Sequence, residues 1–315
     1  MPNWNEVLIE IQTCNRLDAL DFIRRKYLQE LHVLTGRNVI AYYSGWLQKP
    51  GLTNTGINDE DKNALMTTIH GLDRSKGLDL ILHTPGGDTA ATESLVDYLR
   101  KMFDTDIRAI VPQLAMSAGT MIACSCKCII MGKQSSLGPI DPQFGGTPCY
   151  GVIEEFEKAI QEIKLDPSKI PMWQVIVSKY PPTFLGECQK SIDMSSQMVK
   201  KWLENGMFMN NPDAPMLSEQ IVRGLNNHKD TMSHARHIPM DECAIMGLKV
   251  LPIEEPIDGM DLQDLVLTIH HAYMHSFASS PAIKIVENHE GKAMILQHQQ
   301  VQQVLNPTSQ NGQAF

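Results

Sequence analysis

Between residues 38 and 140 the chain alternates short apolar runs with segments of helical periodicity, and this alternation limits the possible folds more than any other feature. The strand-like runs lie at 38–47, 78–83, 107–115 and 128–140. The helical patterns lie between them at 57–74, 88–103 and 117–125. Strands and helices that alternate at this spacing predict βαβ units, right-handed crossovers and a largely parallel sheet.

The flanking segments extend this α/β core. Residues 5–36 carry apolar side chains at helical spacing, so residues 1–36 are predicted to form a helical N-terminal extension. The core domain is expected to span 37–255, with an excursion at 165–205 that begins in a proline-rich stretch. Residues 256–315 are expected to form a C-terminal helix followed by a polar, glutamine-rich tail.

Composition excludes several classes of partner and compartment. The 27 basic and 36 acidic residues give a net charge of -9, which argues against nucleic acid as the main partner. No uncharged run reaches the roughly 18–20 residues of a membrane span, and the N-terminus lacks the apolar stretch of a signal peptide. The seven cysteines form no CxxC zinc pattern and indicate reduced thiols in a cytoplasm. The alternate spacing of Cys124, Cys126 and Cys128 is typical of one face of a strand.

Ser117 stands at a predicted strand-to-helix turn in the stretch "VPQLAMSAGTMIACS". Serine is a good helix N-cap, and that role alone would explain its position. The small residues around it allow a second interpretation, in which the hydroxyl and the next backbone N–H face a substrate carbonyl.

Gly86 and Gly87 follow the strand at 78–83 in "HTPGGD". Because the carboxyl ends of neighbouring parallel strands meet at one edge of the sheet, this turn is expected to lie beside Ser117. The N–H groups of Gly86, Gly87 and Ala118 are then candidates for an oxyanion hole. The turn matches neither GxGxxG nor a phosphate loop, so no dinucleotide or phosphate cofactor is predicted.

The series "HTPGGD", "AMSAGT" and "SSLGPIDPQFGG" resembles the Clp-protease and crotonase superfold, and most closely its serine dehydrogenase proteinase branch. The resemblance runs from about residue 38 to residue 253 and is strongest at 78–146. It implies a fold of repeated ββα-type units, a homo-oligomer of trimer or hexamer type, and a cofactor-free serine peptidase that cleaves peptides or proteins. It also implies a Ser, Asp, His triad whose Asp and His are exchanged relative to Clp proteases.

The implied triad is Ser117, Asp141 and His234. In "IDPQFGG", Asp141 stands where a Clp protease has its histidine, and His234 in "SHARHIPMDECAIMGL" stands near the place of the acid. A direct exchange would put Asp141 beside the serine and His234 behind it. Since serine needs the better base next to it, either the backbone differs so that His234 reaches Ser117, or the triad is different.

Alternatives remain open at this stage. His237 or Lys158 is an alternative base, the lysine as part of a Ser-Lys dyad. A crotonase-like acyl-CoA enzyme or a catalytically silent assembly scaffold would use the same fold. His270, His271 and His275 suggest metal spacing but lack an HExxH glutamate, so no metal is predicted and these residues are expected to lie on an amphipathic helix.

Overall fold

A seven-stranded sheet forms the centre of the chain in the computed structural model, which describes residues 4–226 and 233–298. In spatial order its strands are β10 (Val250–Pro252), β5 (Cys128–Met131), β3 (Ile107–Val111), β2 (Leu78–His83), β1 (Asn38–Ser44), β11 (Ala282–Asn288) and β12 (Ala293–Gln297). The first five strands pair in parallel, β11 pairs antiparallel with β1, and β12 pairs antiparallel with β11. The predicted α/β class with a largely parallel sheet is therefore confirmed.

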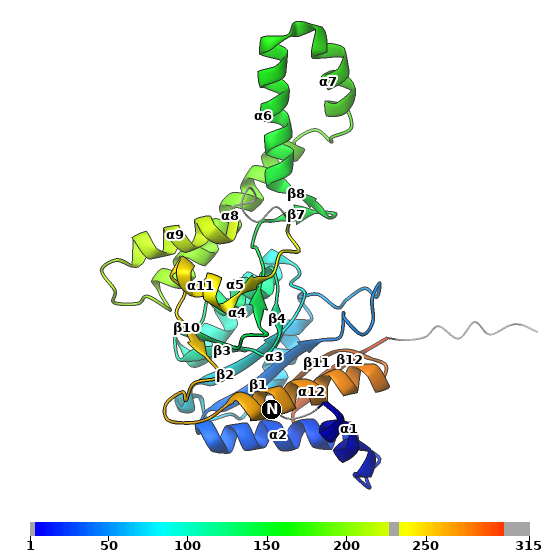
Figure 1. Ribbon diagram of the computed structural model, residues 1–315, viewed down its shortest axis with the longest axis vertical. Coiled ribbons are helices and arrows are strands. Elements are labelled where there is room, and N and C mark those ends of the chain that lie inside the picture. The colour runs from blue at the N-terminus through cyan, green and yellow to red at the C-terminus, as the bar shows by residue number, and fades with distance from the viewer. Residues whose placement is uncertain (1–3, 227–232, 299–315) are drawn as a thin grey trace, which may run out of the picture.

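Helices cover both faces of this sheet, which explains why its strands are apolar on both sides (Figure 1). Every residue of β1, β2 and β3 is buried. Along β1, Ile40 and Tyr42 belong to one hydrophobic core, while Ala41 and Tyr43 belong to the other. The covering helices are α2 (Ala19–Thr35) and α12 (Gln263–Ser279) on one face, with α1 (Trp4–Thr13) beside them, and α3 (Asp61–Ile69), α4 (Thr89–Phe103) and α5 (Ala118–Cys124) on the other.

A small second sheet places the end of β2 next to the start of α5. Its strands are β4 (Leu114–Ala115), β6 (Ser136–Leu137) and β9 (Ile238–Pro239). Thr84, just after β2, forms a bridge to Ala115, through Thr84 N–H to the Leu114 carbonyl at 3.1 Å and Met116 N–H to the Thr84 carbonyl at 3.0 Å. The glycine turn that follows β2 and the turn that carries Ser117 are thus held side by side, as the sequence predicted.

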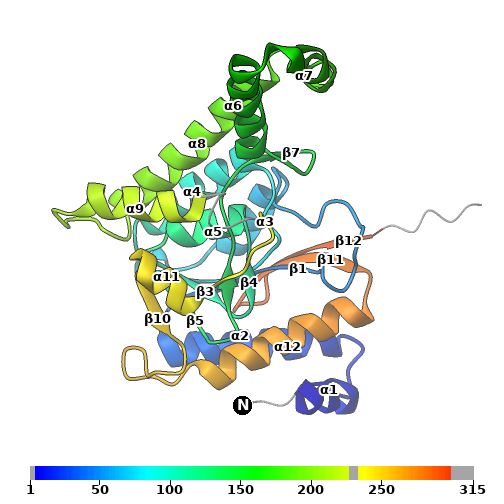
Figure 2. The same cartoon turned by 45° about the horizontal axis from the view of Figure 1, so that its top comes forward.

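A helical arm, defined here as residues 149–190, projects from the body (Figures 1 and 2). It follows the hairpin of β7 (Gln143–Phe144) and β8 (Thr147–Pro148). Its elements are α6 (Cys149–Leu165), the 3₁₀ helix η2 (Pro167–Lys169), α7 (Ile170–Val177) and the first part of α8 (Phe184–Glu204). The chain returns through α9 (Ala214–Asn226) and α11 (Met240–Met246), and η1 (Arg74–Lys76) precedes β2. Cys149, Val152 and Cys188 of the arm form a small core together with Ile192, which lies just beyond it on α8.

Two sequence predictions were wrong or incomplete. Cys124 is the last residue of α5 and Cys126 lies in the three-residue connection 125–127, so only Cys128 of the three is on a strand, because the helix continues up to that connection. The C-terminal segment holds a hairpin, β11–β12, besides the predicted helix. The rest of the predicted polar tail, 299–315, lies outside the described residues. Over the described ranges, no helix is long and apolar enough to cross a bilayer.

Candidate active site

Ser117 occupies a strained turn between β4 and α5. Its φ of 50° and ψ of -115° lie in a region that L-residues rarely adopt, and such strain persists only where the surroundings enforce it. Thr120 anchors the turn, since its buried hydroxyl donates to the Ala115 carbonyl at 2.8 Å and accepts from Gly138 N–H at 2.9 Å. Ser117 stands at the N-cap position, yet its Oγ makes no capping hydrogen bond, so capping does not explain this serine.

The glycine turn lies directly against Ser117. Gly86 and Gly87 have φ values of 96° and 156°, and a Cβ added at Gly86 would stand 2.7 Å from the Ser117 Cβ. Gly86 N–H donates to Thr84 Oγ1 at 3.2 Å, so this group is already engaged. Among the described residues, neither Gly87 N–H nor Ala118 N–H has a protein acceptor. Two of the three candidate oxyanion donors are therefore free.

His234 and Asp141 form a hydrogen-bonded pair, with 2.7 Å between Nδ1 and Oδ1. Asp141 follows β6 and is only 1% exposed, whereas the His234 side chain is 24% exposed. An ionised carboxylate can only accept, so His234 Nδ1–H donates and Nε2 is left free. A direct exchange of positions would have put Asp141 beside the serine. Instead the histidine lies on the open side and the carboxylate is buried behind it.

One cavity of about 660 Å³ joins these groups. Ser117, His234 and Gly87 line it, and Asp141 does not. Its apolar walls are formed by Pro85, Met121, Ile140, Phe144 and Met194. Neither Phe144 nor Met194 was assigned a role from the sequence: Phe144 lies in the "IDPQFGG" stretch, where only Asp141 was singled out, and Met194 of α8 belongs to no motif. Within residues 4–226 and 233–298, Ser117 Oγ and His234 are not hydrogen-bonded to each other, an arrangement that can tighten when substrate binds.

The two alternative bases lie elsewhere. Lys158 is on α6 in the arm, is 66% exposed and faces Glu162 at 4.0 Å. His237 is exposed, and neither it nor Lys158 lines the cavity. Asp88, which follows the glycine turn, caps α4 by accepting from Ala91 N–H at 2.7 Å.

His83, His270 and His275 make packing and hydrogen-bond contacts away from the cavity. His83 is buried against the rings of Trp46 and His270, at centroid distances of 4.4 and 5.1 Å. Burial lowers the pKa of His83 well below 6.5 and that of His270 to about 3, so both are neutral. His275 Nε2 lies 3.1 Å from the Trp4 carbonyl and joins α12 to α1. In the part of the chain that the structure describes, no cluster of His, Cys, Asp and Glu side chains is arranged to hold a metal ion.

Comparison with known proteins identifies a family for most of the chain. Residues 19–232 match the family described as ClpP-like SDH-type serine proteinase. The uncharacterized protein MJ0137 of Methanocaldococcus jannaschii is 38% identical over 102 residues, which are 32% of this chain and 35% of that protein. The uncharacterized protein MJ1495 of the same organism is 30% identical over 146 residues, 44% of this chain and 49% of that protein. The chain thus spans less than half the length of each of these curated relatives.

Proposed function

The chain belongs to the family of ClpP-like SDH-type serine proteinases, and on that premise we propose that it is a serine endopeptidase whose nucleophile is Ser117. The family that the sequence motifs indicated is thereby confirmed. The observation that carries the proposal is the strained, uncapped Ser117, which opens into the same cavity as a histidine paired with a buried carboxylate.

In the proposed mechanism His234 is the general base and Asp141 orients it. His234 Nδ1–H is directed to Asp141, so Nε2 is the nitrogen that takes the Ser117 proton as Oγ attacks the peptide carbonyl. The same nitrogen then gives the proton to the leaving amine, and water hydrolyses the acyl-enzyme by the reverse route. Asp141 holds the tautomer and stabilises the imidazolium.

Gly87 N–H and Ala118 N–H are the proposed oxyanion donors. Both are free of protein acceptors in the described ranges, and they flank the serine from two elements. Gly86 has a different role in this proposal. Its lack of a side chain lets the turn approach Ser117, and its own N–H bonds to Thr84.

The apolar walls of the cavity suggest the substrate class. Met121, Ile140, Phe144 and Met194 would accept an apolar side chain next to the scissile bond. We therefore expect peptides or unfolded protein segments with apolar residues at the cleavage site to be the preferred substrates.

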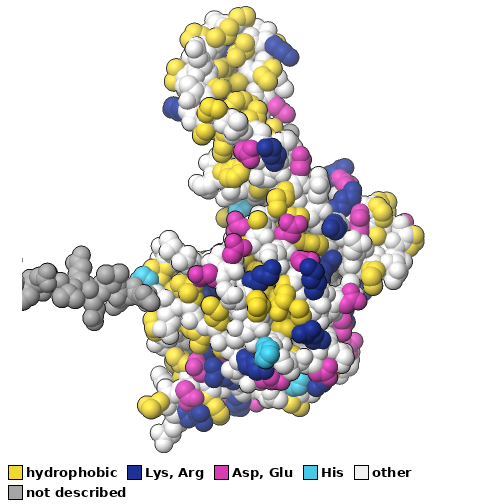
Figure 3. All heavy atoms as spheres, turned by 180° about the vertical axis from the view of Figure 1, so that it is seen from behind, with side chains coloured by type: hydrophobic (Ala, Val, Ile, Leu, Met, Phe, Trp, Pro, Cys, Tyr) yellow, Lys and Arg dark blue, Asp and Glu magenta, His cyan; other side chains and the backbone are white. Residues whose placement is uncertain are grey.

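We further propose a homo-oligomer of trimer or hexamer type that works in the cytoplasm. Hydrophobic side chains gather along the projecting arm (Figure 3), and such patches commonly mark contact surfaces. The exposed ones are Ile160, Leu165, Ile170, Met172, Val175 and Leu185. All seven cysteines are free thiols, as a reducing compartment requires. Light scattering should give three or six times the chain mass of 35.3 kDa, and a monomer would contradict the oligomer.

Hydrolysis of an internally quenched peptide tests the proposed activity. Ser117→Ala should lower kcat by at least about 10⁴-fold with the fold intact, because the nucleophile is gone. Ser191→Ala is the matched control, since Ser191 lines the same cavity away from the strained turn. An acyl-CoA enzyme of the same fold needs no serine nucleophile and gives no reason for strain at Ser117. A silent scaffold would hydrolyse nothing.

The same assay separates the bases. His234→Ala should inactivate the enzyme, while His237→Ala and Lys158→Ala should keep activity within about twofold of the parent. An inactive His237→Ala or Lys158→Ala variant that is folded would show that His234 is the wrong base.

A further inference from the structure

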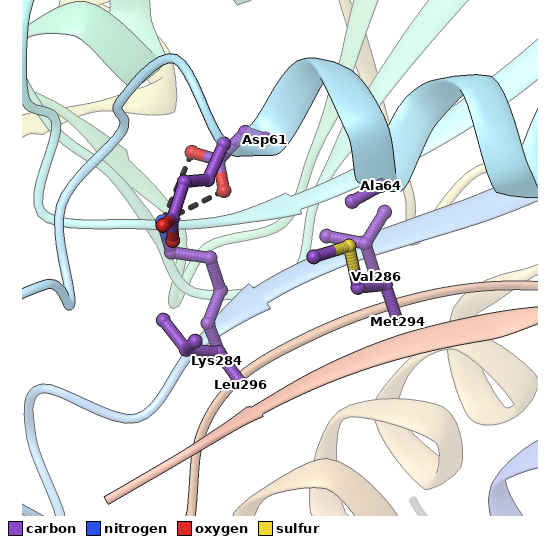
Figure 4. Close-up of a pocket in the computed structure, with 7 residues that line it drawn as sticks. Asp61, Ala64, Lys284, Val286, Met294 and Leu296 are labelled. Atoms are coloured by element: carbon purple, nitrogen blue, oxygen red, sulfur yellow. Dashed lines mark hydrogen bonds and ion pairs between the residues drawn. The ribbon is translucent and has the colours of Figure 1, made fainter.

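The inner surface of the β11–β12 hairpin carries a buried ion pair that the proposed mechanism does not use. Lys284 of β11 and Asp61 at the start of α3 are only 3% and 4% exposed. Lys284 Nζ lies 2.8 and 2.9 Å from the two Asp61 carboxylate oxygens (Figure 4). Burial of two charges is costly unless they are paired and fully hydrogen-bonded, so the other contacts of this pair matter.

Those contacts converge on the loop that precedes α3. Lys284 Nζ donates to the Gly56 carbonyl at 2.7 Å. The Asp61 carboxylate accepts from Asn58 N–H at 3.0 Å and from the Tyr42 hydroxyl at 2.7 Å. The ion pair therefore binds the backbone on both sides of Ile57, one residue before it and one residue after it.

Ile57 in turn holds the glycine turn. Its N–H donates to the Gly86 carbonyl at 2.8 Å, and its carbonyl accepts from Asp88 N–H at 2.9 Å. Gly87 lies between these two hydrogen bonds and packs so closely that an added Cβ would stand 2.3 Å from the Ile57 N and O. Both polar groups of Ile57 are thus used to fix the residues on either side of Gly87.

We propose that Lys284 and Asp61 are positioning residues for the oxyanion hole: they fix residues 56–58, and through Ile57 they fix the direction of Gly87 N–H. An oxyanion donor acts only if it is held in place before the charge develops, which requires support from a second layer of contacts. Lys284 lies outside the span 19–232 that matches the family, so the C-terminal hairpin supplies this support. The inference rests on the proposed peptidase function.

The test compares two double variants with the parent enzyme. Lys284→Met with Asp61→Leu replaces the ion pair by apolar side chains of similar volume, an exchange that proteins often tolerate. We expect kcat to fall about tenfold to a hundredfold with KM within about twofold, because the displaced N–H contacts the transition state and not the bound substrate. If this variant does not fold, Tyr42→Phe, which removes one donor from the same carboxylate, should give a smaller fall in kcat at unchanged KM.

The matched control is Arg24→Met with Glu287→Leu. This pair is also buried and also uses β11, but its hydrogen bonds within the described part of the chain go to α2 and α12 and to no residue of 56–58. It should leave kcat of the folded enzyme within about twofold of the parent. Equal losses in both double variants, or full kcat in Lys284→Met with Asp61→Leu, would overturn the positioning role while leaving the peptidase function intact. A parent enzyme that hydrolyses no peptide would overturn both.

Discussion

Gly87→Ala is the substitution that the geometry of the oxyanion turn predicts most sharply. The added Cβ would stand 2.3 Å from the Ile57 N and O, whereas real Cβ atoms stay beyond 3.0 Å, so the glycine turn and the Ile57 backbone must separate by about 0.7 Å or more. A hydrogen bond from Gly87 N–H to an oxyanion does not survive a shift of that size. Removal of one oxyanion donor lowers kcat by about 10²–10³-fold, or about 2.7–4 kcal/mol in the barrier.

The assay is hydrolysis of a quenched peptide at saturating substrate, with circular dichroism as the check on folding. Gly51→Ala is the matched control, because Gly51 also has a positive φ, 83°, but a Cβ there would meet nothing within 4 Å. It should lose about 1 kcal/mol of stability and no activity. A folded Gly87→Ala variant with kcat within twofold of the parent would refute the assignment of this turn to the oxyanion hole.

Two further predictions concern histidines. His234→Ala and Asp141→Asn should each lower kcat by at least about 10³-fold, and the double variant should be little worse than His234→Ala alone, since members of a triad act as a unit; additive losses would contradict a shared role. The free energy of unfolding should decrease as the pH is lowered from about 6.5. Burial depresses the pKa of His83 and His270 in the folded state, so the stability that these neutral side chains contribute is fully present above their unfolded pKa and is lost as the pH falls towards their folded pKa. Each should contribute about 1.4 kcal/mol per pH unit. Urea unfolding at pH 7 and pH 5 measures this, His270→Leu should flatten the dependence, and equal slopes in parent and variant would disprove it.

Those parts of the fold and of the candidate site that depend on local sequence patterns could be predicted from the sequence. The strand before "HTPGGD" and the turn at Ser117 could be predicted because apolar runs, glycines and helical periodicity are local signals. The bridge between Thr84 and Ala115 then follows from parallel neighbours, which place their carboxyl ends together. Local signals therefore predicted the turn that carries Ser117, the glycine turn and their proximity.

What could not be predicted depends on contacts between distant residues. β11 was missed because "AIKIVEN" contains Lys284, Glu287 and Asn288, which look like surface residues until Asp61, Arg24 and the Thr68 carbonyl are seen to pair with them. All seven positions of β11 are buried. A buried polar strand cannot be told from an exposed loop without knowledge of its partners.

The order of His234 and Asp141 was also beyond the sequence. The two residues are 93 positions apart, and a motif comparison gives their places along the chain but not which side chain faces the cavity. In the folded chain Asp141 is buried, whereas the His234 side chain is 24% exposed and lines the cavity.

Labelling with a fluorophosphonate probe followed by peptide mapping tests directly whether Ser117 is the nucleophile, because the probe reacts only with an activated serine. We expect one modified residue, Ser117, in the parent protein, and loss of labelling in His234→Ala although Ser117 is still present. Failure of the folded parent to react, or modification of a different serine, would contradict the claim that Ser117 is the nucleophile of a serine peptidase.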